Sequence, residues 1–88
     1  MNLKNKKILI TGATGGIGNT LVSKFIEQGC LVLATGTNED KLNKLKSDFR
    51  EVKIKKFKLD QHLDIEKFID DCHTELGGLD VVINNAGI

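Results

Sequence analysis

Short apolar runs alternate with amphipathic stretches along the whole 88-residue sequence. Four of these runs have the length and composition of β-strands, at residues 8–10, 30–34, 51–59 and 79–83. Between them, apolar residues recur at the spacing of one helix face. Strands joined by single helices must be parallel, and their crossovers are right-handed. The sequence therefore predicts an α/β fold, a Rossmann-like βαβαβαβ half with a parallel sheet of order 3-2-1-4 in three α/β/α layers.

Each of the three predicted helices carries one apolar stripe and recognisable end signals. The stripe of the first helix, which Gly29 ends, consists of Ile17, Leu21, Val22, Phe25 and Ile26. Asn38 can cap the second helix, whose stripe consists of Leu42, Leu45 and Phe49. Asp64 can cap the third helix, which Gly77 and Gly78 end and whose stripe consists of Ile65, Phe68, Ile69, Cys72 and Leu76. Each helix can therefore cover one face of a sheet.

The third predicted strand has a mixed pattern. Val52 and Ile54 share one phase of the strand alternation, and Phe57 and Leu59 share the other. We therefore expect either a bulge near residues 55–56 or a strand that starts late. The lysines at 53, 55, 56 and 58 are typical of an exposed sheet edge.

The last predicted strand is an edge strand in the order 3-2-1-4, although it is one of the most apolar segments. Val81, Val82 and Ile83 would stand beside unpaired backbone N–H and C=O groups. We therefore expect further sequence beyond Ile88, or a partner strand, to cover this edge. On this interpretation residues 1–88 are the truncated N-terminal part of a single Rossmann-fold domain, and the fold is incomplete.

The segment TGATGGIG, from Thr11 to Gly18, lies directly between the first predicted strand and the first predicted helix. A helix N-terminus offers unpaired N–H groups and about half a positive charge to an anion. Glycine removes the Cβ atoms that would obstruct the backbone. We therefore predict that this loop binds the diphosphate of a dinucleotide. Glycines at 12, 16 and 18 fit TGxxxGxG and glycines at 12, 15 and 18 fit GxxGxxG, so the loop alone leaves two branches of dehydrogenase-like proteins open.

The end of the second predicted strand bears on the choice of nicotinamide cofactor. NAD-binding proteins usually place an Asp or Glu about 20 residues beyond the first glycine, on the ribose 2′-hydroxyl. Residues 34–37 read Ala-Thr-Gly-Thr, with no carboxylate to repel a 2′-phosphate. Thr14, Thr37 and Asn38 could donate hydrogen bonds to that phosphate, and Lys41 is the nearest cation, since positions 14, 15, 37 and 38 hold no basic residue. The sequence favours NADP over NAD.

Composition and charge argue against several other classes of function. The net charge of +1 provides no broad positive field for nucleic acid or an anionic membrane. No apolar run approaches the roughly 20 residues needed to span a bilayer. Cys30 and Cys72 fit no metal or redox spacing, and His62 and His73 are isolated. We therefore expect a cytoplasmic protein with two buried, reduced cysteines and no metal, nucleic-acid or membrane partner.

Two motifs together resemble the short-chain dehydrogenase/reductase family. They are Thr11-Gly12-x-x-x-Gly16-x-Gly18 and the Asn-Asn-Ala-Gly at residues 84–87. The second motif favours the TGxxxGxG branch, and the resemblance extends over the whole chain but only the N-terminal part of a typical member. Within the family the chain is most similar to the bacterial 3-oxoacyl-[acyl-carrier-protein] reductases. It departs from many NADP-using members in having Gly15 where they carry a basic residue.

The resemblance implies a role for individual residues. Residues 12–15 would contact the pyrophosphate and adenosine phosphate, Thr37 the 2′-phosphate, and Asn85 the ribose next to the nicotinamide. Asp60 and Gln61 would contact the adenine, although capping the turn into the third helix is an equal alternative for Asp60. The complete predicted cofactor-binding set is Gly12, Ala13, Thr14, Gly15, Gly16, Ile17, Gly18, Thr37, Asp60, Gln61, Asn85, Ala86 and Gly87.

The resemblance also implies a reaction. The similar reductases use NADPH to reduce the 3-keto group of an acyl chain bound to acyl-carrier protein in fatty-acid synthesis, and family members are often homo-oligomers. The family's chemistry depends on a Ser and a Tyr-x-x-x-Lys element that follow the Asn-Asn-Ala-Gly segment, and this sequence contains no tyrosine. We therefore predict no catalytic residue here and expect the cofactor half of an oxidoreductase. The alternative is a catalytically inactive dinucleotide-binding module or remnant that needs a partner chain.

Overall fold

The computed structural model describes residues 3–57 and 65–85, which contain one four-stranded parallel sheet. Its strands are β1 (Lys7–Thr11), β2 (Leu31–Gly36), β3 (Lys53–Lys56) and β4 (Val81–Asn84). The order across the sheet is β3-β2-β1-β4, so the predicted order 3-2-1-4 is confirmed. The described strand ends differ from the predicted ranges by one to three residues, because backbone pairing rather than apolar content sets them.

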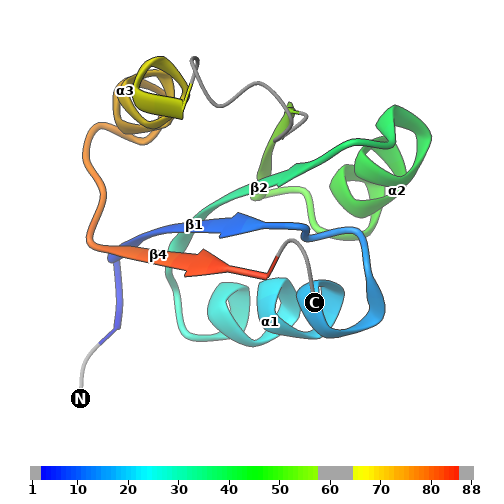
Figure 1. The fold of residues 1–88 in the computed structure, drawn as a ribbon. Coiled ribbons are helices and arrows are strands. Elements are labelled where there is room, and N and C mark those ends of the chain that lie inside the picture. Colours follow the sequence, from blue (N-terminus) through cyan, green and yellow to red (C-terminus); the bar gives the residue numbers. More distant parts are fainter. Residues whose placement is uncertain (1–2, 58–64, 86–88) are drawn as a thin grey trace.

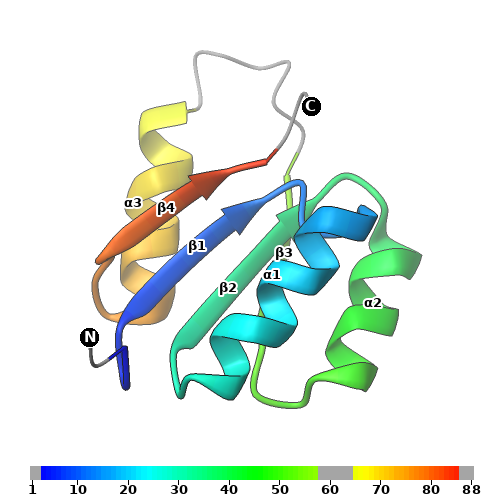
Figure 2. The same ribbon diagram turned by 90° about the horizontal axis from the view of Figure 1, so that it is seen from below.

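Helices cover both faces of this sheet. Helices α1 (Gly16–Glu27) and α2 (Glu39–Asp48) lie on one face, and α3 (Ile65–Leu76) lies on the other (Figures 1 and 2). The buried cluster on the first face includes Ile8, Ile10, Val22, Val32 and Leu45. The cluster on the second face consists of Leu9, Leu33, Phe68, Cys72 and Leu76. Successive side chains of β1 and β2 enter opposite clusters, as the strand alternation requires, and the predicted three layers are confirmed.

The helix ends follow the sequence signals. α1 ends at Glu27, and a Schellman motif at Gly29 follows it: the backbone N–H groups of residues 29 and 30 donate to carbonyls of the last turn at 3.0 and 3.1 Å. Asn38 caps α2, because its Oδ1 accepts a hydrogen bond from the Lys41 backbone N–H at 3.0 Å. The predicted cap Asp64 lies outside the described residues.

The first turns of α1 and α3 depart from the predicted apolar stripes. Ile17 is 63% exposed and Ile65 is 41% exposed, although the stripes placed both toward the core. In α1 the buried residue of the first turn is Gly18, which packs on the preceding turn. In α3 burial begins only at Phe68. Periodicity identified the buried face of each helix but not the point along it where contact with the sheet begins.

β3 pairs regularly with β2 over residues 53–56, so of the two predicted alternatives the bulge near residues 55–56 is absent and the late start is present. The register places Lys53 opposite Leu33 and Lys56 opposite Gly36. Ile54 packs against the α1 and α2 side of the sheet, and Phe57 packs against the α3 side, where its ring stacks on Phe68 at 3.8 Å between centroids. The two phases in the sequence are therefore the two covered faces of one strand that starts at Lys53, later than the predicted range.

Lysines on β3 lie on an edge strand, as predicted, and one of them also binds a helix end. Within the described part of the chain, β3 has β2 as its one neighbour. Lys53 Nζ donates to Glu75 O at 2.8 Å, and Lys7 Nζ donates to Gly77 O at 3.0 Å. Both carbonyls are at the C-terminal end of α3, where cations satisfy unpaired carbonyls and the negative end of the helix dipole. These two lysines therefore help to hold α3 against the sheet.

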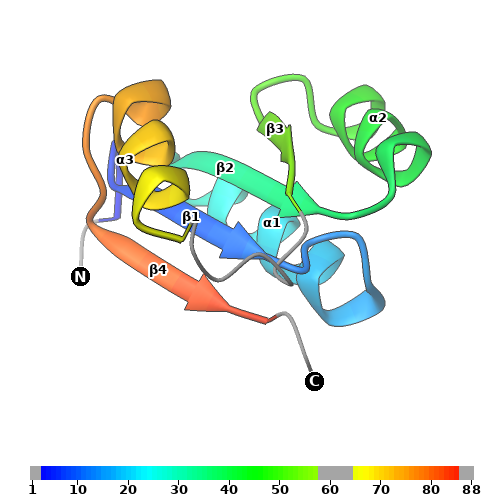
Figure 3. The same ribbon diagram turned by 45° about the horizontal axis from the view of Figure 1, so that its top comes forward.

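β4 forms the opposite edge of the sheet (Figure 3). Among the described residues it pairs with β1 alone. Val81 is 40% exposed and Val82 is 51% exposed, so the expected apolar edge strand is present. Such an edge is a template for pairing with another strand.

We predict that the 88-residue chain, produced alone, self-associates through β4. Val82→Lys should shift the sedimentation profile toward the monomer, because a charged side chain on an edge opposes strand pairing. Leu31→Lys is the matched control, since Leu31 is also exposed (43%) but lies on β2 inside the sheet. A sharp monomer boundary for the unsubstituted chain at high concentration would contradict this prediction.

Candidate functional site

The turn between β1 and α1 carries the glycine-rich segment at the carboxyl edge of the sheet. β1 ends at Thr11 and α1 begins at Gly16. Gly12 has φ +61°, a left-handed backbone conformation that other residues rarely adopt. The Ala13 N–H donates to Thr35 O at 2.9 Å, which ties the turn to β2. Ligands of open α/β sheets bind outside this edge.

Gly18 is the point at which α1 contacts the turn. A Cβ atom there would lie 2.6 Å from Ala13 Cα and 2.7 Å from Gly12 O. Both neighbours are backbone atoms, so neither can move aside cheaply. The start of α1 therefore rests directly on the turn that follows β1.

Gly15 and Gly16 differ from Gly12 and Gly18 because the fold does not require them. A Cβ on Gly16 would meet nothing within 4 Å, and one on Gly15 would meet only Gly12 O, at 3.9 Å. Gly15 is the N-cap of α1 and supplies no side-chain hydrogen bond, and the first turn contains no acidic residue. The backbone N–H groups of residues 16–18 precede the first bond of the helix, from Asn19 N to Gly15 O. The helix therefore begins with an open, uncapped and electropositive end that suits an anion.

A hydrogen-bonded link joins β4 to this turn. Asn85 Nδ2 donates to Gly12 O at 3.0 Å, and the Asn85 backbone N–H donates to Thr11 Oγ1 at 3.1 Å. The Thr11 hydroxyl in turn donates to Asn84 Oδ1 at 3.0 Å. Asn85 therefore holds the glycine-rich turn in place. Sequence reasoning missed Thr11 and Asn84, although polar residues at the ends of two strands of the predicted sheet were a usable signal.

The end of β2 forms the floor between the turn and α2. A Cβ on Gly36 would lie 3.1 Å from Thr14 Cγ2 and 3.6 Å from Leu42 Cδ2. The glycine-rich turn and the first part of α2 therefore converge over Gly36. Thr37 follows immediately and is exposed, and no carboxylate occurs before Glu39.

The structure brings most of the predicted residues to one edge of the sheet. The glycine-rich segment follows β1, Thr37 follows β2, and Asn85 follows β4. Ile17, exposed in the first turn of α1, lies beside the open amides. The remaining members of the predicted set, Asp60, Gln61, Ala86 and Gly87, lie outside the described residues.

Cysteine and metal chemistry find no support in the described residues. Cys30 and Cys72 are free and buried, and burial raises the pKa of both thiols, that of Cys72 to about 11. Both are therefore protonated near neutral pH and poor nucleophiles. Residues 3–57 and 65–85 contain no group of three or more His, Cys, Asp or Glu that could hold a metal ion. No helix in these ranges has the length and apolar character needed to cross a bilayer.

Comparison with known proteins links this geometry to one family. Residues 6–88 match the family model described as short chain dehydrogenase. The NADP-dependent 3-hydroxy acid dehydrogenase YdfG of Escherichia coli is 33% identical over 82 residues, which cover 92% of this chain and 33% of that protein. A 3alpha-hydroxysteroid dehydrogenase of Mediterraneibacter gnavus is 37% identical over 94 residues, covering 100% of this chain and 38% of that protein.

Solved structures give the same relationship. A short chain dehydrogenase from Mycobacterium smegmatis superposes with a TM-score of 0.89 at 27% identity, covering 99% of this chain and 38% of that one. A short-chain type dehydrogenase/reductase from Mycobacterium marinum gives 0.88 at 28% identity, covering 99% and 37%. The chain spans about a third of the length of the curated relatives it matches.

We predict that Gly18→Ala and Gly16→Ala differ sharply in stability. The first should lose about 2 kcal/mol or more of the free energy of unfolding, because its Cβ overlaps backbone atoms. The second should change stability by less than about 1 kcal/mol, since its Cβ meets open space and alanine favours helix. Urea denaturation of the two variants measures this, and equal losses would contradict the close packing of α1 on the turn.

Proposed function

Because this chain belongs to the short-chain dehydrogenase family, we propose that residues 12–18 hold the diphosphate of a nicotinamide dinucleotide for an oxidoreductase that uses NADP(H). The observation that carries the proposal is the open N-terminus of α1. Gly15 and Gly16 leave its first amides accessible, and no side chain caps or neutralises them. Preorganised backbone donors at a helix end are well suited to a diphosphate.

The residues around the turn would position the rest of the cofactor. Thr37 and Thr14 would donate to the adenosine side, and Asn85 and the exposed Ile17 would lie toward the nicotinamide side. Asp60, Gln61, Ala86 and Gly87 complete the proposed contact set. When bound, the dinucleotide supplies or accepts a hydride. The protein's part is to bind and orient it, since hydride transfer requires the reacting atoms to be held in register.

NADP(H) is favoured over NAD(H) by the end of β2. No carboxylate follows the strand in the position that would grip a ribose 2′-hydroxyl, and Glu39 is already the first residue of α2. The Escherichia coli relative YdfG is named as an NADP-dependent enzyme. Because residue 15 is glycine rather than Arg or Lys, the glycine-rich turn itself offers no cation to the 2′-phosphate.

The substrate we propose for the whole protein is a 3-oxoacyl group on acyl-carrier protein. The motifs at residues 11–18 and 84–87 support it by resemblance. The names of the two relatives indicate that they act on 3-hydroxy acids and hydroxysteroids. Both kinds of substrate carry a hydroxyl group on a carbon chain or ring. We further propose a homo-oligomeric, cytoplasmic protein. The second candidate is a catalytically inactive dinucleotide-binding module that needs a partner chain, which the exposed apolar edge of β4 favours.

The proposal predicts that the complete encoded protein binds NADPH, measured by enhancement of its fluorescence. The Gly16→Ala variant should fold normally but bind NADPH about tenfold more weakly. Its Cβ would lie where the diphosphate must approach, and would lengthen one or two hydrogen bonds between backbone N–H groups and the charged phosphates. Binding of neither NADPH nor NADH would contradict the proposal.

Reduction assays then separate the substrates. NADPH oxidation should be fastest with a 3-oxoacyl-[acyl-carrier-protein], compared with a free 3-oxo acid and a 3-ketosteroid at equal concentration. Binding of NADPH without reduction of any ketone would favour the non-catalytic module.

A further inference from the structure

A cavity opens between β3 and α3, on the face of the sheet opposite α1 and α2. Its volume is about 230 Å³, and the described residues that line it are Lys55, Phe57, Lys67, Phe68 and Asp71. None of these five residues belongs to the glycine-rich turn or to the set proposed above for the dinucleotide. A cavity of this size suits a ligand of one ring with a small substituent, because drug-sized ligands occupy larger pockets.

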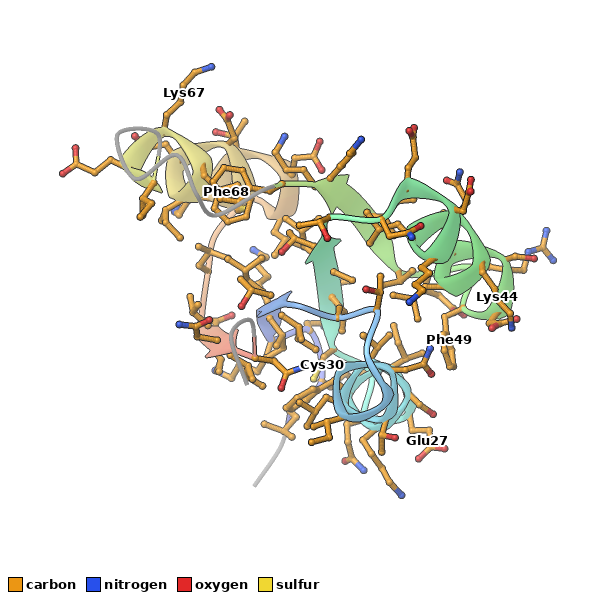
Figure 4. The ribbon with its side chains drawn as sticks, turned by 45° about the vertical axis from the view of Figure 1, so that its right-hand side comes forward. Glu27, Cys30, Lys44, Phe49, Lys67 and Phe68 are labelled. Atoms are coloured by element: carbon orange, nitrogen blue, oxygen red, sulfur yellow. The ribbon has the colours of Figure 1, made fainter. Side chains whose placement is uncertain are left out.

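Two aromatic rings form one wall of this cavity. The rings of Phe57 and Phe68 stack with 3.8 Å between their centroids and 18° between their planes. Phe68 is buried in the cluster under α3, and Figure 4 shows it on the side of the helix that faces β3. Phe57 packs against the same cluster but is only half-buried. Part of an aromatic surface is therefore accessible to a planar ligand.

Lys55 adds a positive charge on the inner side of the cavity. Strand alternation directs its side chain to the α3 face with that of Phe57, and directs Lys56 to the opposite face with Ile54. Lys55 is half-buried, and within residues 3–57 and 65–85 its ammonium group has no hydrogen-bond or ion-pair partner. Burial raises the pKa of the Cys72 thiol to about 11, and the charge of Lys55 opposes that rise, so the ammonium group lies near α3.

The other two charged residues of the cavity come from α3. Lys67 lies in the first turn of the helix, where the dipole disfavours a cation, and it extends outward at the open side of the cavity (Figure 4). Asp71 follows Lys67 by one turn, but among the described residues no ion pair joins it to Lys67 or to Lys55. Two lysines and one aspartate give the lining a net charge of +1, which matches a ligand with a single negative charge.

We propose that this cavity binds a small aromatic carboxylate that carries one negative charge. The ring packs against Phe57, and the carboxylate accepts a hydrogen bond from the Lys55 ammonium group, with Lys67 at the open side. A ligand held in this way contacts β3 and α3 together, so its binding stabilises the packing of the helix on the edge of the sheet. The site is separate from the open start of α1 and does not depend on the dinucleotide.

The test is titration of the complete encoded protein with sodium benzoate, followed by NMR of the aromatic side chains. Signals of Phe57 and Phe68 should shift with a Kd of about 1 mM, the affinity expected for a ligand of one ring. Two probes separate the contributions of ring and charge. Cyclohexanecarboxylate retains the charge but has no flat ring, and benzyl alcohol retains the ring but has no charge. Each should bind at least about fivefold more weakly than benzoate.

Three variants then test the charges of the lining. Lys55→Met should weaken benzoate binding about tenfold, the loss expected for one charge-assisted hydrogen bond. Lys56→Met is the matched control, because it removes the same charge from the next position of β3, whose side chain points to the opposite face. It should bind benzoate like the unsubstituted protein. Asp71→Asn should strengthen benzoate binding about threefold, because it removes a like charge from the cavity.

Several outcomes would overturn the proposal. They are equal effects of Lys55→Met and Lys56→Met, equal binding of the three probes, and signals of Phe57 and Phe68 that do not move at the highest soluble benzoate concentration. Displacement of benzoate from these residues by NADP⁺ would assign the cavity to the dinucleotide site and would also overturn it. If benzoate binds as expected but NADP⁺ does not bind, only the function proposed above is overturned.

Discussion

The close contact between Gly18 and the β1–α1 turn is the constraint on which the rest of the site depends. Because a Cβ at Gly18 would lie 2.6 Å from Ala13 Cα, α1 can start at the end of β1 only with glycine there. That contact fixes where the first amides of α1 point. Asn85 then holds the Gly12 carbonyl from β4, so two strands and a helix determine the shape of a single turn.

The glycines of the turn divide into those that the fold requires and those that it leaves free. Gly12 needs its left-handed backbone and Gly18 needs its close approach, whereas Gly15 and Gly16 face open space. A protein that used this turn only as a connection would gain helix stability from other residues at those two positions. The flexibility that Gly15 and Gly16 add to the unfolded chain has a physical reason if a ligand occupies the open space beside them.

Much of the fold could be predicted from the sequence, because strand length, helical periodicity and the parallel connection are local signals. They predicted the order β3-β2-β1-β4, the cap at Asn38 and the end of α1 at Gly29. The errors concern relations between elements. Ile17 fits the apolar spacing of the first helix, but its side chain is exposed because α1 contacts the sheet only further along the helix. For β3 the sequence left a bulge and a late start open, because it does not state that both faces of the strand are covered, and the structure shows the late start. The link from Thr11 to Asn84 depends on the register of β1 with β4, which no local pattern encodes.

The central claim is that the backbone amides at the start of α1 bind a diphosphate. NMR spectra of the backbone amides, recorded on the complete encoded protein during titration with inorganic pyrophosphate and then NADP⁺, test it most directly. The account predicts that the signals of Gly16, Ile17 and Gly18 shift strongly with both ligands, while those at the other end of α1, around Glu27, remain in place. Unchanged signals at the three N-terminal amides, under conditions where NADP⁺ is bound, would contradict the account.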